Sequence, residues 1–232
     1  MVTRYVALGD SISIDDYSGG PGRGGASLLH RNRDDDFPEW RGRDLLSRDP
    51  EAGLALLATD GATRRTLLDV QLPRLERLPD PPTLVTLTIG GNDLLGCYGD
   101  TPSARAVLPQ VADAVATTLR HPRLQQARLA IGTVYDPSDG TGDAAALRLP
   151  PWPDAVALID ELNDALRAVA TEHGAAVAEI GRQFQGHGLL AGDPTRGEAR
   201  PAERDLWFCS VIEPNAWGAS GVRAAFWNAF DL

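Results

Sequence analysis

Lysine is absent from the chain, so all 22 basic residues are arginines. Schiff-base catalysis and P-loop phosphate binding both need a lysine, and both are excluded. Cysteine is scarce: Cys97 and Cys209 form no CxxC pair and no metal-site spacing, so we expect two reduced, buried thiols. No apolar run approaches the roughly 20 residues of a membrane span, and no leader-like segment follows Met1. These absences predict a soluble, cytoplasmic protein without a membrane partner.

Positive charge is also in deficit, because 32 acidic residues outnumber the 22 basic ones and leave a formal net charge of −10. This balance argues against charge-driven binding to nucleic acid or to an anionic membrane. A length of 232 residues suits one full-sized α/β domain and is short for two. Because no repeat and no linker interrupts the chain, we expect one domain spanning residues 1–232.

Apolar segments of strand and helix type alternate five times along the chain. Strands are expected at 5–8, 54–58, 84–89, 129–134 and 175–180. The first helix is expected to start within 40–46 and to end at Asp49-Pro50, and further helices are expected at 66–78, 102–119, 154–173 and 219–230. The alternation predicts an α/β fold, a three-layer α/β/α sandwich with a five-stranded parallel sheet. Two irregular stretches, 14–43 and 185–205, are rich in turn-forming residues, and we expect them to shape a pocket.

Three of the predicted strands end in polar turns that contain glycine. The turns are Gly9-Asp10-Ser11, Asp60-Gly61-Ala62 and Gly90-Gly91-Asn92-Asp93. In a parallel sheet these turns share the carboxyl edge, where open α/β sheets bind ligands. Ser11 is therefore a candidate nucleophile, and the Gly61 N–H and the Asn92 amide are candidate donors to an oxyanion. Asp10 and Asp93 are expected to support the turns, Asp93 as a cap of the next segment.

These three blocks, in order and each at a strand end, resemble those of the SGNH (GDSL-like) hydrolase family. A further stretch, Pro214 to Ala219, matches the region of that family's last block. The resemblance covers nearly the whole chain and implies a flavodoxin-like sandwich without a metal or an organic cofactor. It also implies serine esterase chemistry on a small-molecule ester, with Ser11 as the nucleophile. Gly61, Asn92 and the Ser11 N–H would then donate to the oxyanion.

The last block departs from the family's Asp-x-x-His-Pro pattern, in which the histidine is the base and the aspartate orients it. Ser210 stands in place of the aspartate, and Glu213 in place of the histidine. The remaining candidate bases are the four histidines, His30, His121, His173 and His187. His121 and His173 are expected at the opposite edge of the sheet, and nothing orients His30. His187 follows the fifth predicted strand, between two glycines, and belongs at the active edge.

Three hypotheses follow for this site. In the first, His187 is a relocated base that Glu213 orients, because a triad is defined by geometry and not by chain order. In the second, Glu213 itself accepts the Ser11 proton, which requires burial to raise its pKa above about 4.3. In the third, the site binds a ligand without turnover, or turns over only a special substrate.

The predicted activity is hydrolysis of an ester with a small or medium acyl group through a Ser11 acyl-enzyme. The same site would support acyl transfer to an acceptor other than water if the irregular stretches exclude water. A non-catalytic binding protein on the same fold is the alternative from another class, since fold does not fix function.

Overall fold

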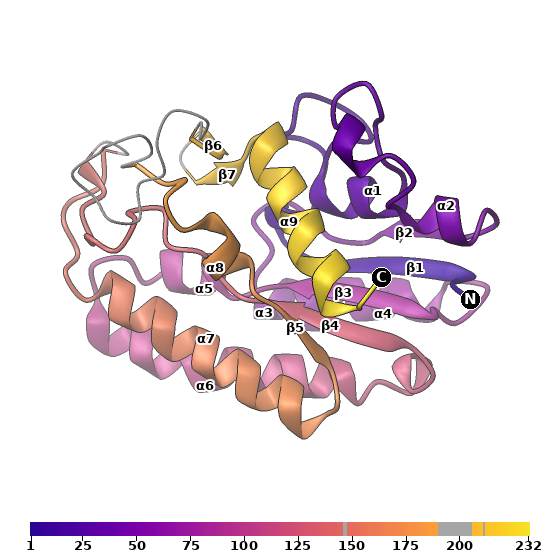
Figure 1. The fold of residues 1–232 in the computed structure, drawn as a ribbon. Helices are drawn as coiled ribbons and strands as arrows, with labels where there is room; N and C mark the ends of the chain where they lie inside the picture. Colours follow the sequence, from indigo (N-terminus) through magenta and orange to yellow (C-terminus); the bar gives the residue numbers. More distant parts are fainter. Residues whose placement is uncertain (146–147, 190–205, 211) are drawn as a thin grey trace.

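Five parallel strands form the central sheet in the computed structural model of this chain (Figure 1). The structure describes residues 1–145, 148–189, 206–210 and 212–232. The strands lie in the order β2-β1-β3-β4-β5 and are β1 (Arg4–Gly9), β2 (Gly53–Leu56), β3 (Leu84–Thr88), β4 (Arg128–Gly132) and β5 (Ala176–Ala178). The predicted five-stranded parallel sheet is therefore confirmed.

Helices cover both faces of the sheet and complete the predicted three-layer sandwich (Figure 1). One face is covered by α3 (Arg64–Thr66), α4 (Leu72–Glu76), α6 (Thr101–Leu119) and α7 (Ala155–Glu172). The other face is covered by α1 (Gly25–His30), α2 (Leu45–Arg48), α8 (Ile180–Phe184) and α9 (Ala216–Ala229). The short helix α5 (Gly91–Leu95) follows β3 at the carboxyl edge.

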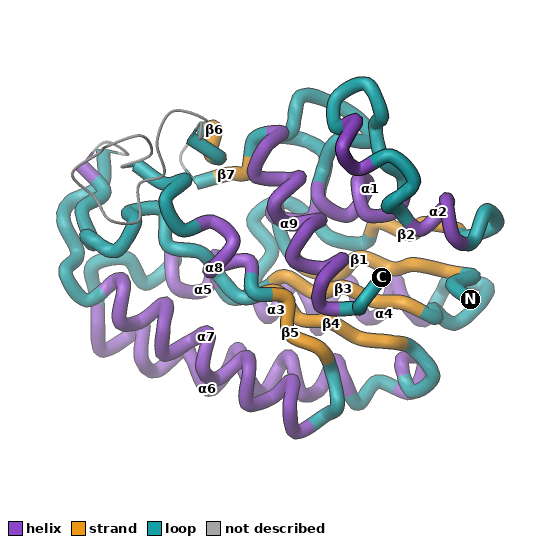
Figure 2. The backbone as a smooth tube through the Cα atoms, viewed as in Figure 1, coloured by secondary structure: helices purple, strands orange, loops and turns teal. Residues whose placement is uncertain are grey.

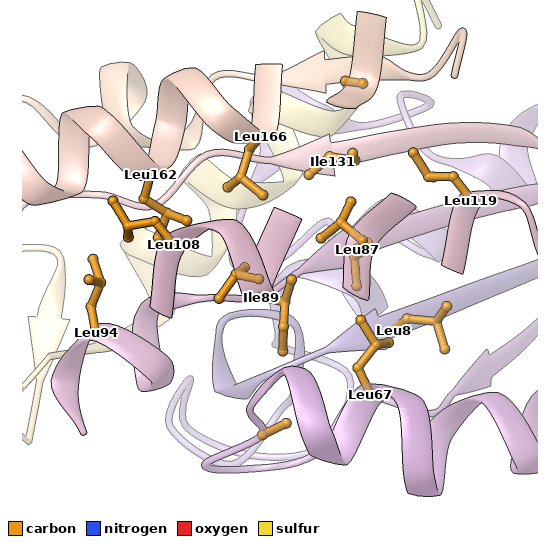
Figure 3. Packing of buried hydrophobic residues seen from close by; sticks show 14 of the residues in the cluster. Leu8, Leu67, Leu87, Ile89, Leu94, Leu108, Leu119, Ile131, Leu162 and Leu166 are labelled. Carbon is orange, nitrogen blue, oxygen red and sulfur yellow. The ribbon is translucent and has the colours of Figure 1, made fainter. Parts of the chain in front are cut away.

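Side chains of β1 alternate between the two cores that the layers enclose. Val6 and Leu8 face one core, and Tyr5 and Ala7 face the other, with all four fully buried. Because both faces are covered, the strand is a continuous apolar run in the sequence. Figure 3 shows the first core, in which sheet residues meet leucines of the covering helices, namely Leu8, Leu87 and Ile131 with Leu67, Leu108, Leu162 and Leu166.

The stretch 14–43, predicted to be irregular, contains the helix α1 and a 3-10 turn at Pro38–Trp40. Helix α1 packs so closely on α9 that a Cβ atom on Gly25 would lie 2.7 Å from Val222 Cγ1. The glycines that suggested a loop in the sequence therefore permit a close helix–helix contact. A helix of six residues is also too short to show a periodic pattern.

The first helix, predicted to start within 40–46 and to end at Asp49-Pro50, is α2, which begins at Leu45, late in that range, and ends at Arg48. Gly42 adopts φ +75°, which interrupts any helix that starts at Trp40. Asp44 then caps the new helix by accepting the Ser47 N–H at 2.7 Å.

The helix predicted at 66–78 is present but is interrupted by a π turn. Pro73 has no N–H, and its ring would clash with the carbonyl four residues earlier in a regular helix. The chain forms a π turn over Leu67–Gln71, in which the Leu72 N–H donates to the Leu67 carbonyl. The result is α3, the π turn and α4 in direct succession.

Two short strands before α9, β6 (Phe208–Cys209) and β7 (Glu213–Pro214), pair antiparallel, and we call this pair the hairpin. Of the second irregular stretch, residues 190–205 lie outside the described residues. Cys97 and Cys209 are free thiols, as predicted, but both are half-buried.

The strand order reverses between β1 and β3, which carry Ser11 and Asn92 just beyond their carboxyl ends. Open α/β sheets bind ligands at such a switch point. Figure 2 shows loops gathered at this edge of the sheet, on the left of the view. Among the helices that the structure describes, none has the length and apolar character to cross a membrane.

Candidate active site

Ser11 lies in a tight turn where β1 ends against β3. Gly9 adopts φ +116°, and a Cβ atom there would lie 1.8 Å from the Thr88 carbonyl oxygen, so only glycine fits. The Asp10 N–H donates to the same carbonyl at 3.0 Å, and the Asp10 carboxyl accepts the Ile12 N–H at 3.3 Å. Ser11 itself is 5% exposed and opens a 3-10 turn. Backbone contacts therefore fix the position of Ser11.

Glu213 comes from the other end of the chain and lines the same cavity as Ser11. Burial raises the pKa of Glu213, the nearby Ser11 side chain lowers it, and the negative charge of Asp60 raises it. The net shift is upward. The Glu213 Oε2 atom is buried and has no hydrogen-bond partner among the described residues. A carboxylate in this environment, next to a hydroxyl, is placed to accept a proton.

Asn92 and Gly61 lie in the two turns that face the Ser11 turn. The Asn92 Nδ2 atom donates to the Ala62 carbonyl at 3.1 Å, which joins the second and third turns. Gly61 adopts φ +63°, and no heavy atom lies within 4 Å of the position of a Cβ atom there. Asn92 lines the cavity that holds Ser11, whereas Gly61 lies on the exposed side of its turn.

Asp93 strengthens the same junction from inside the protein. Its buried carboxylate accepts the Arg64 N–H at 2.9 Å and the Arg64 guanidinium at 2.5 Å. We expected Asp93 to cap the segment that follows it. Instead it links the start of α3 to α5, so the second and third turns are held together by an ion pair as well as by Asn92.

His187 is buried, and its ring stacks on Trp207 with a centroid distance of 3.6 Å and an interplanar angle of 18°. Its N–H donates to the Phe184 carbonyl, and its carbonyl accepts the Trp207 N–H, both at 3.0 Å. His187 is not among the described residues that line the cavity containing Ser11 and Glu213. The structure thus brings Ser11, Asn92 and Glu213 around one cavity and places His187 outside its lining.

The other three histidines are not among the described residues that line this cavity. His30 contacts the Ala52 carbonyl at 2.7 Å through Nε2. His121 pairs with Glu76 at 3.3 Å, at the amino edge of the sheet where the sequence placed it. His173 follows the last residue of α7, at that same edge.

Two carboxyl groups lie close to Ser11 in this site. Burial and, to a smaller extent, the charge of Glu213 raise the pKa of Asp10 to about 7, against hydrogen bonds from Thr88 and Ile12 that lower it. The Asp60 side chain, burial and nearby negative charges raise the Tyr17 pKa to about 12. Two carboxyl groups therefore flank Ser11, and each disfavours its charged form. Among the described residues, no group of three or more His, Cys, Asp or Glu side chains is arranged to hold a metal ion.

A cavity of about 130 Å³ opens beside Ser11. Polar groups surround Ser11, but most of the lining of the cavity is apolar. The apolar lining includes Ile89, Leu94, Leu95, Val134, Leu149, Trp152, Ile159 and Ile212. None of the described lining residues comes from 14–43, so the expectation that this stretch walls the pocket is wrong for this cavity. The segment between β4 and α7 forms the wall instead.

Two aromatic rings in this lining have their polar atoms bonded to the protein. The Trp152 Nε1–H donates to Thr101 Oγ1 at 3.0 Å, and the Tyr98 hydroxyl donates to the Pro150 carbonyl at 2.6 Å. The rings pack edge to face with centroids 5.0 Å apart. With these polar atoms already paired, the rings offer apolar surface to a ligand.

Gln71 is a residue of this neighbourhood that the sequence analysis missed. It is fully buried, and its carboxamide bonds both the N–H and the carbonyl of Gly9, at 2.8 and 2.7 Å. A signal was present, because Gln71 lies midway between Leu67 and Leu75 in a stripe whose leucines are both fully buried. A polar residue in such a stripe needs a buried partner.

Most of the chain matches a known family at the level of sequence. The family model of the GDSL-like lipases and acylhydrolases matches residues 7–219. No curated protein sequence matches the chain.

Several solved structures share the fold. Phospholipase A1 from Streptomyces albidoflavus NA297 is similar with a TM-score of 0.64 and 21% identity, over 99% of this chain and 100% of that one. Axe2, an acetylxylan esterase from Geobacillus stearothermophilus, gives 0.62 and 16% over 99% and 94%. The extracellular lipase from Streptomyces rimosus gives 0.59 and 20% over 98% and 99%. The solved structures agree with the family model in fold. Because that model matches most of the chain, the chain belongs to the GDSL-like lipase/acylhydrolase family of ester hydrolases.

Proposed function

We propose that the protein hydrolyses carboxylic esters through an acyl intermediate on Ser11, with Glu213 as the general base. The position of Glu213 beside Ser11 in one cavity carries the proposal. A serine hydroxyl is a weak nucleophile until an adjacent base takes its proton. The raised pKa of Glu213 makes it a stronger base than an exposed carboxylate.

In the acylation half-reaction, Ser11 Oγ attacks the ester carbonyl carbon as its proton passes to the Glu213 carboxylate. The tetrahedral intermediate carries its negative charge on the former carbonyl oxygen. Its collapse breaks the bond to the alcohol oxygen, which takes the proton from Glu213. The alcohol leaves, and the acyl group remains bound to Ser11.

In the deacylation half-reaction, a water molecule replaces the alcohol. Glu213 accepts one water proton as the water oxygen attacks the acyl carbon. Collapse of the second intermediate returns that proton to Ser11 Oγ and releases the acid. Both intermediates need hydrogen-bond donors for the oxyanion, and we assign these to the Asn92 amide, the Gly61 N–H and the Ser11 N–H.

His187 is the alternative base. The stacking of its ring on Trp207, and its position outside the cavity lining, favour Glu213 instead. A structural role for His187 explains its burial, because its backbone and ring together hold the segment that leads into the hairpin.

The cavity suggests the kind of ester. Its mostly apolar lining and its volume of about 130 Å³ suit a short or medium apolar acyl group. The carboxyl groups of Asp10 and Glu213 disfavour an acyl group that carries a negative charge. We therefore propose uncharged acyl esters of small molecules as substrates, and a cytoplasmic location in keeping with the free thiols.

The experiment that tests this function is labelling of the folded protein with a fluorophosphonate, followed by peptide mass spectrometry. We expect modification of Ser11 that increases with pH as Glu213 loses its proton, and none in Ser11→Ala. Failure of the folded wild-type protein to label at any pH, together with failure to hydrolyse p-nitrophenyl esters, would contradict an esterase and favour a binding protein.

The acyl preference is tested with p-nitrophenyl esters of increasing chain length. Trp152→Ala removes a large ring from the lining, and we expect the chain length with the highest kcat/KM to increase. Each methylene that a hydrophobic pocket binds changes kcat/KM by roughly 10-fold to 200-fold, so the longer esters should gain in the variant. An unchanged chain-length profile in the folded variant would contradict binding of the acyl group in this cavity.

A further inference from the structure

The carboxamide of Gln71 contacts the backbone of the nucleophile turn from the side opposite β3. We propose that Gln71 is a positioning residue, which fixes the Gly9 main chain and through it the attacking geometry of Ser11. The inference rests on the proposed esterase function. It adds to that function a residue outside the blocks that resemble the family.

The contacts of Gln71 add to the backbone contact that Gly9 makes past the end of β2. The register between β1 and β2 ends at the pair of Ala7 with Leu56, and beyond this pair the Thr59 N–H donates to the Gly9 carbonyl at 3.0 Å. The Gln71 Oε1 atom accepts the Gly9 N–H at 2.8 Å, and its Nε2 atom donates to the Gly9 carbonyl at 2.7 Å. Because these two bonds reproduce the donor and acceptor of a peptide group, they extend the sheet beyond the end of β2.

Gly9 requires such a constraint. The steric contact with Thr88 restricts this position to glycine, and glycine has the most backbone freedom of any residue. Thr88 holds the turn from β3 by accepting the Asp10 N–H at 3.0 Å. Gln71 holds it from the opposite side, so the residue two positions before Ser11 is bonded on both sides.

Burial of the Gln71 carboxamide costs free energy unless its polar atoms are hydrogen-bonded. Its side chain is fully buried, where an unpaired carboxamide would be strongly destabilising. The Nε2 atom also approaches Thr59 Oγ1 at 3.3 Å, so both ends of the carboxamide are bonded. Gln71 closes the π turn that Pro73 imposes, and π turns occur frequently at functional sites.

A positioning role predicts a specific kinetic effect. Gln71 does not belong to the cavity lining among the described residues, so its loss leaves substrate binding intact. Loss of the two bonds leaves the Gly9 N–H without its side-chain acceptor and the Gly9 carbonyl held by the Thr59 N–H, and lets Ser11 Oγ move away from the line of attack. The effect therefore falls on kcat and on the rate of fluorophosphonate labelling, and KM stays close to that of the wild type.

The first test compares Gln71→Met with Leu75→Ala, which lies in the same buried stripe of the same helix. We expect Gln71→Met to lower kcat by roughly 10-fold to 100-fold with KM changed by no more than about twofold, as for a misplaced reacting group. Leu75→Ala loses thermal stability but keeps the wild-type kcat. A folded Gln71→Met variant with the wild-type kcat would overturn the inference.

The second test uses Gln71→Glu, which also serves if the methionine variant does not fold. A protonated glutamic acid has one donor and one acceptor and reproduces both bonds, whereas the ionised form has no donor. The ratio of variant to wild-type kcat should therefore fall as pH rises. A ratio that does not change with pH would contradict the inference.

Two results distinguish failure of the positioning role of Gln71 from failure of the proposed esterase function. If the wild type hydrolyses esters and Gln71 variants behave like it, only the positioning role is overturned. If the wild type neither labels nor hydrolyses esters, the proposed function and this inference are both overturned.

Discussion

The proposed nucleophile and the proposed base lie on parts of the site that are held in place differently. We call the turn that carries Ser11 the nucleophile half and the hairpin that carries Glu213 the base half. Ser11 follows a turn whose backbone is bonded by Thr88 and Gln71 and whose glycine admits no side chain. Glu213 lies on a hairpin whose strands are two residues each. The side chain of Asn215 joins the hairpin to α9 and to the segment before β6: it accepts the Trp217 and Gly218 N–H groups at 3.0 and 3.1 Å and donates to the Leu206 carbonyl at 2.6 Å.

This difference shows which half tolerates a change of residue. The nucleophile half is defined by main-chain geometry, so a substitution there disturbs the sheet itself. The base half is defined by which side chain the hairpin presents. We therefore expect the scaffold to accept Glu213 at the position where the resemblance predicts a histidine. The predictions below test this contrast.

The largest effect is expected from Gly9→Ala in the nucleophile half. The new Cβ atom would lie 1.8 Å from the Thr88 carbonyl oxygen, and we expect a loss of more than about 4 kcal/mol in the free energy of unfolding. Gly20→Ala is the matched control, because Gly20 adopts φ +129° in open space. It should cost only about 1–2 kcal/mol, the strain of the left-handed backbone. Equal losses in urea denaturation would contradict the steric account.

The next effect concerns Asp10 and its burial beside Ser11. Its pKa rises from 3.8 to about 7 on folding, so the folded protein binds more protons than the unfolded chain within this pH window. Stability contributed by this group therefore falls as pH rises from about 4 to about 7. Asp10→Asn removes that dependence and should stabilise the protein above pH 7 by up to roughly 4 kcal/mol, at about 1.36 kcal/mol per pH unit.

Thermal unfolding across pH 4 to 8 checks this prediction, since the gain of Asp10→Asn over the wild type should grow with pH. Asp69→Asn removes the same charge from an exposed helix position and should leave the wild-type pH dependence in place. A constant gain of Asp10→Asn at all pH values would show that burial of the carboxylate is not the cause.

The smallest effect on stability is expected in the base half. Asn215→Ala removes the cap of α9 and should cost about 1 kcal/mol in the free energy of unfolding. Asn215→Asp keeps the accepting oxygen for the cap but loses the donor to the Leu206 carbonyl. We expect the aspartate variant to retain its stability and to lose kcat, because the hairpin that carries Glu213 is less well held. Wild-type kcat in Asn215→Asp would contradict this role of the hairpin.

The nucleophile half could be predicted from the sequence because its signals are local. A buried strand that ends in Gly9 and is followed at once by polar residues identifies Ser11. The two glycines before Asn92 identify the third turn in the same way. The alternation of strands and helices then places these turns at one edge of the sheet.

The base half could not be resolved from sequence because it depends on contacts between distant segments. The stacking of His187 on Trp207 joins residues on either side of the stretch 190–205, and no local pattern reveals it. The cavity that Ser11 and Glu213 share brings together the two ends of the chain. Gln71 is intermediate, because its polar side chain in an apolar stripe is visible, but its partner Gly9 is set by the packing of the helix on β1.

The measurement that most directly tests the central claim is the kcat for ester hydrolysis by Glu213→Gln and by His187→Phe. The phenylalanine retains an aromatic ring against Trp207, so its effect reports on chemistry more than on packing. We predict a fall of roughly 100-fold to 10,000-fold for Glu213→Gln, the range for loss of a general base, and nearly wild-type kcat for His187→Phe. Loss of activity in His187→Phe with activity retained in Glu213→Gln would contradict the account and identify His187 as the base.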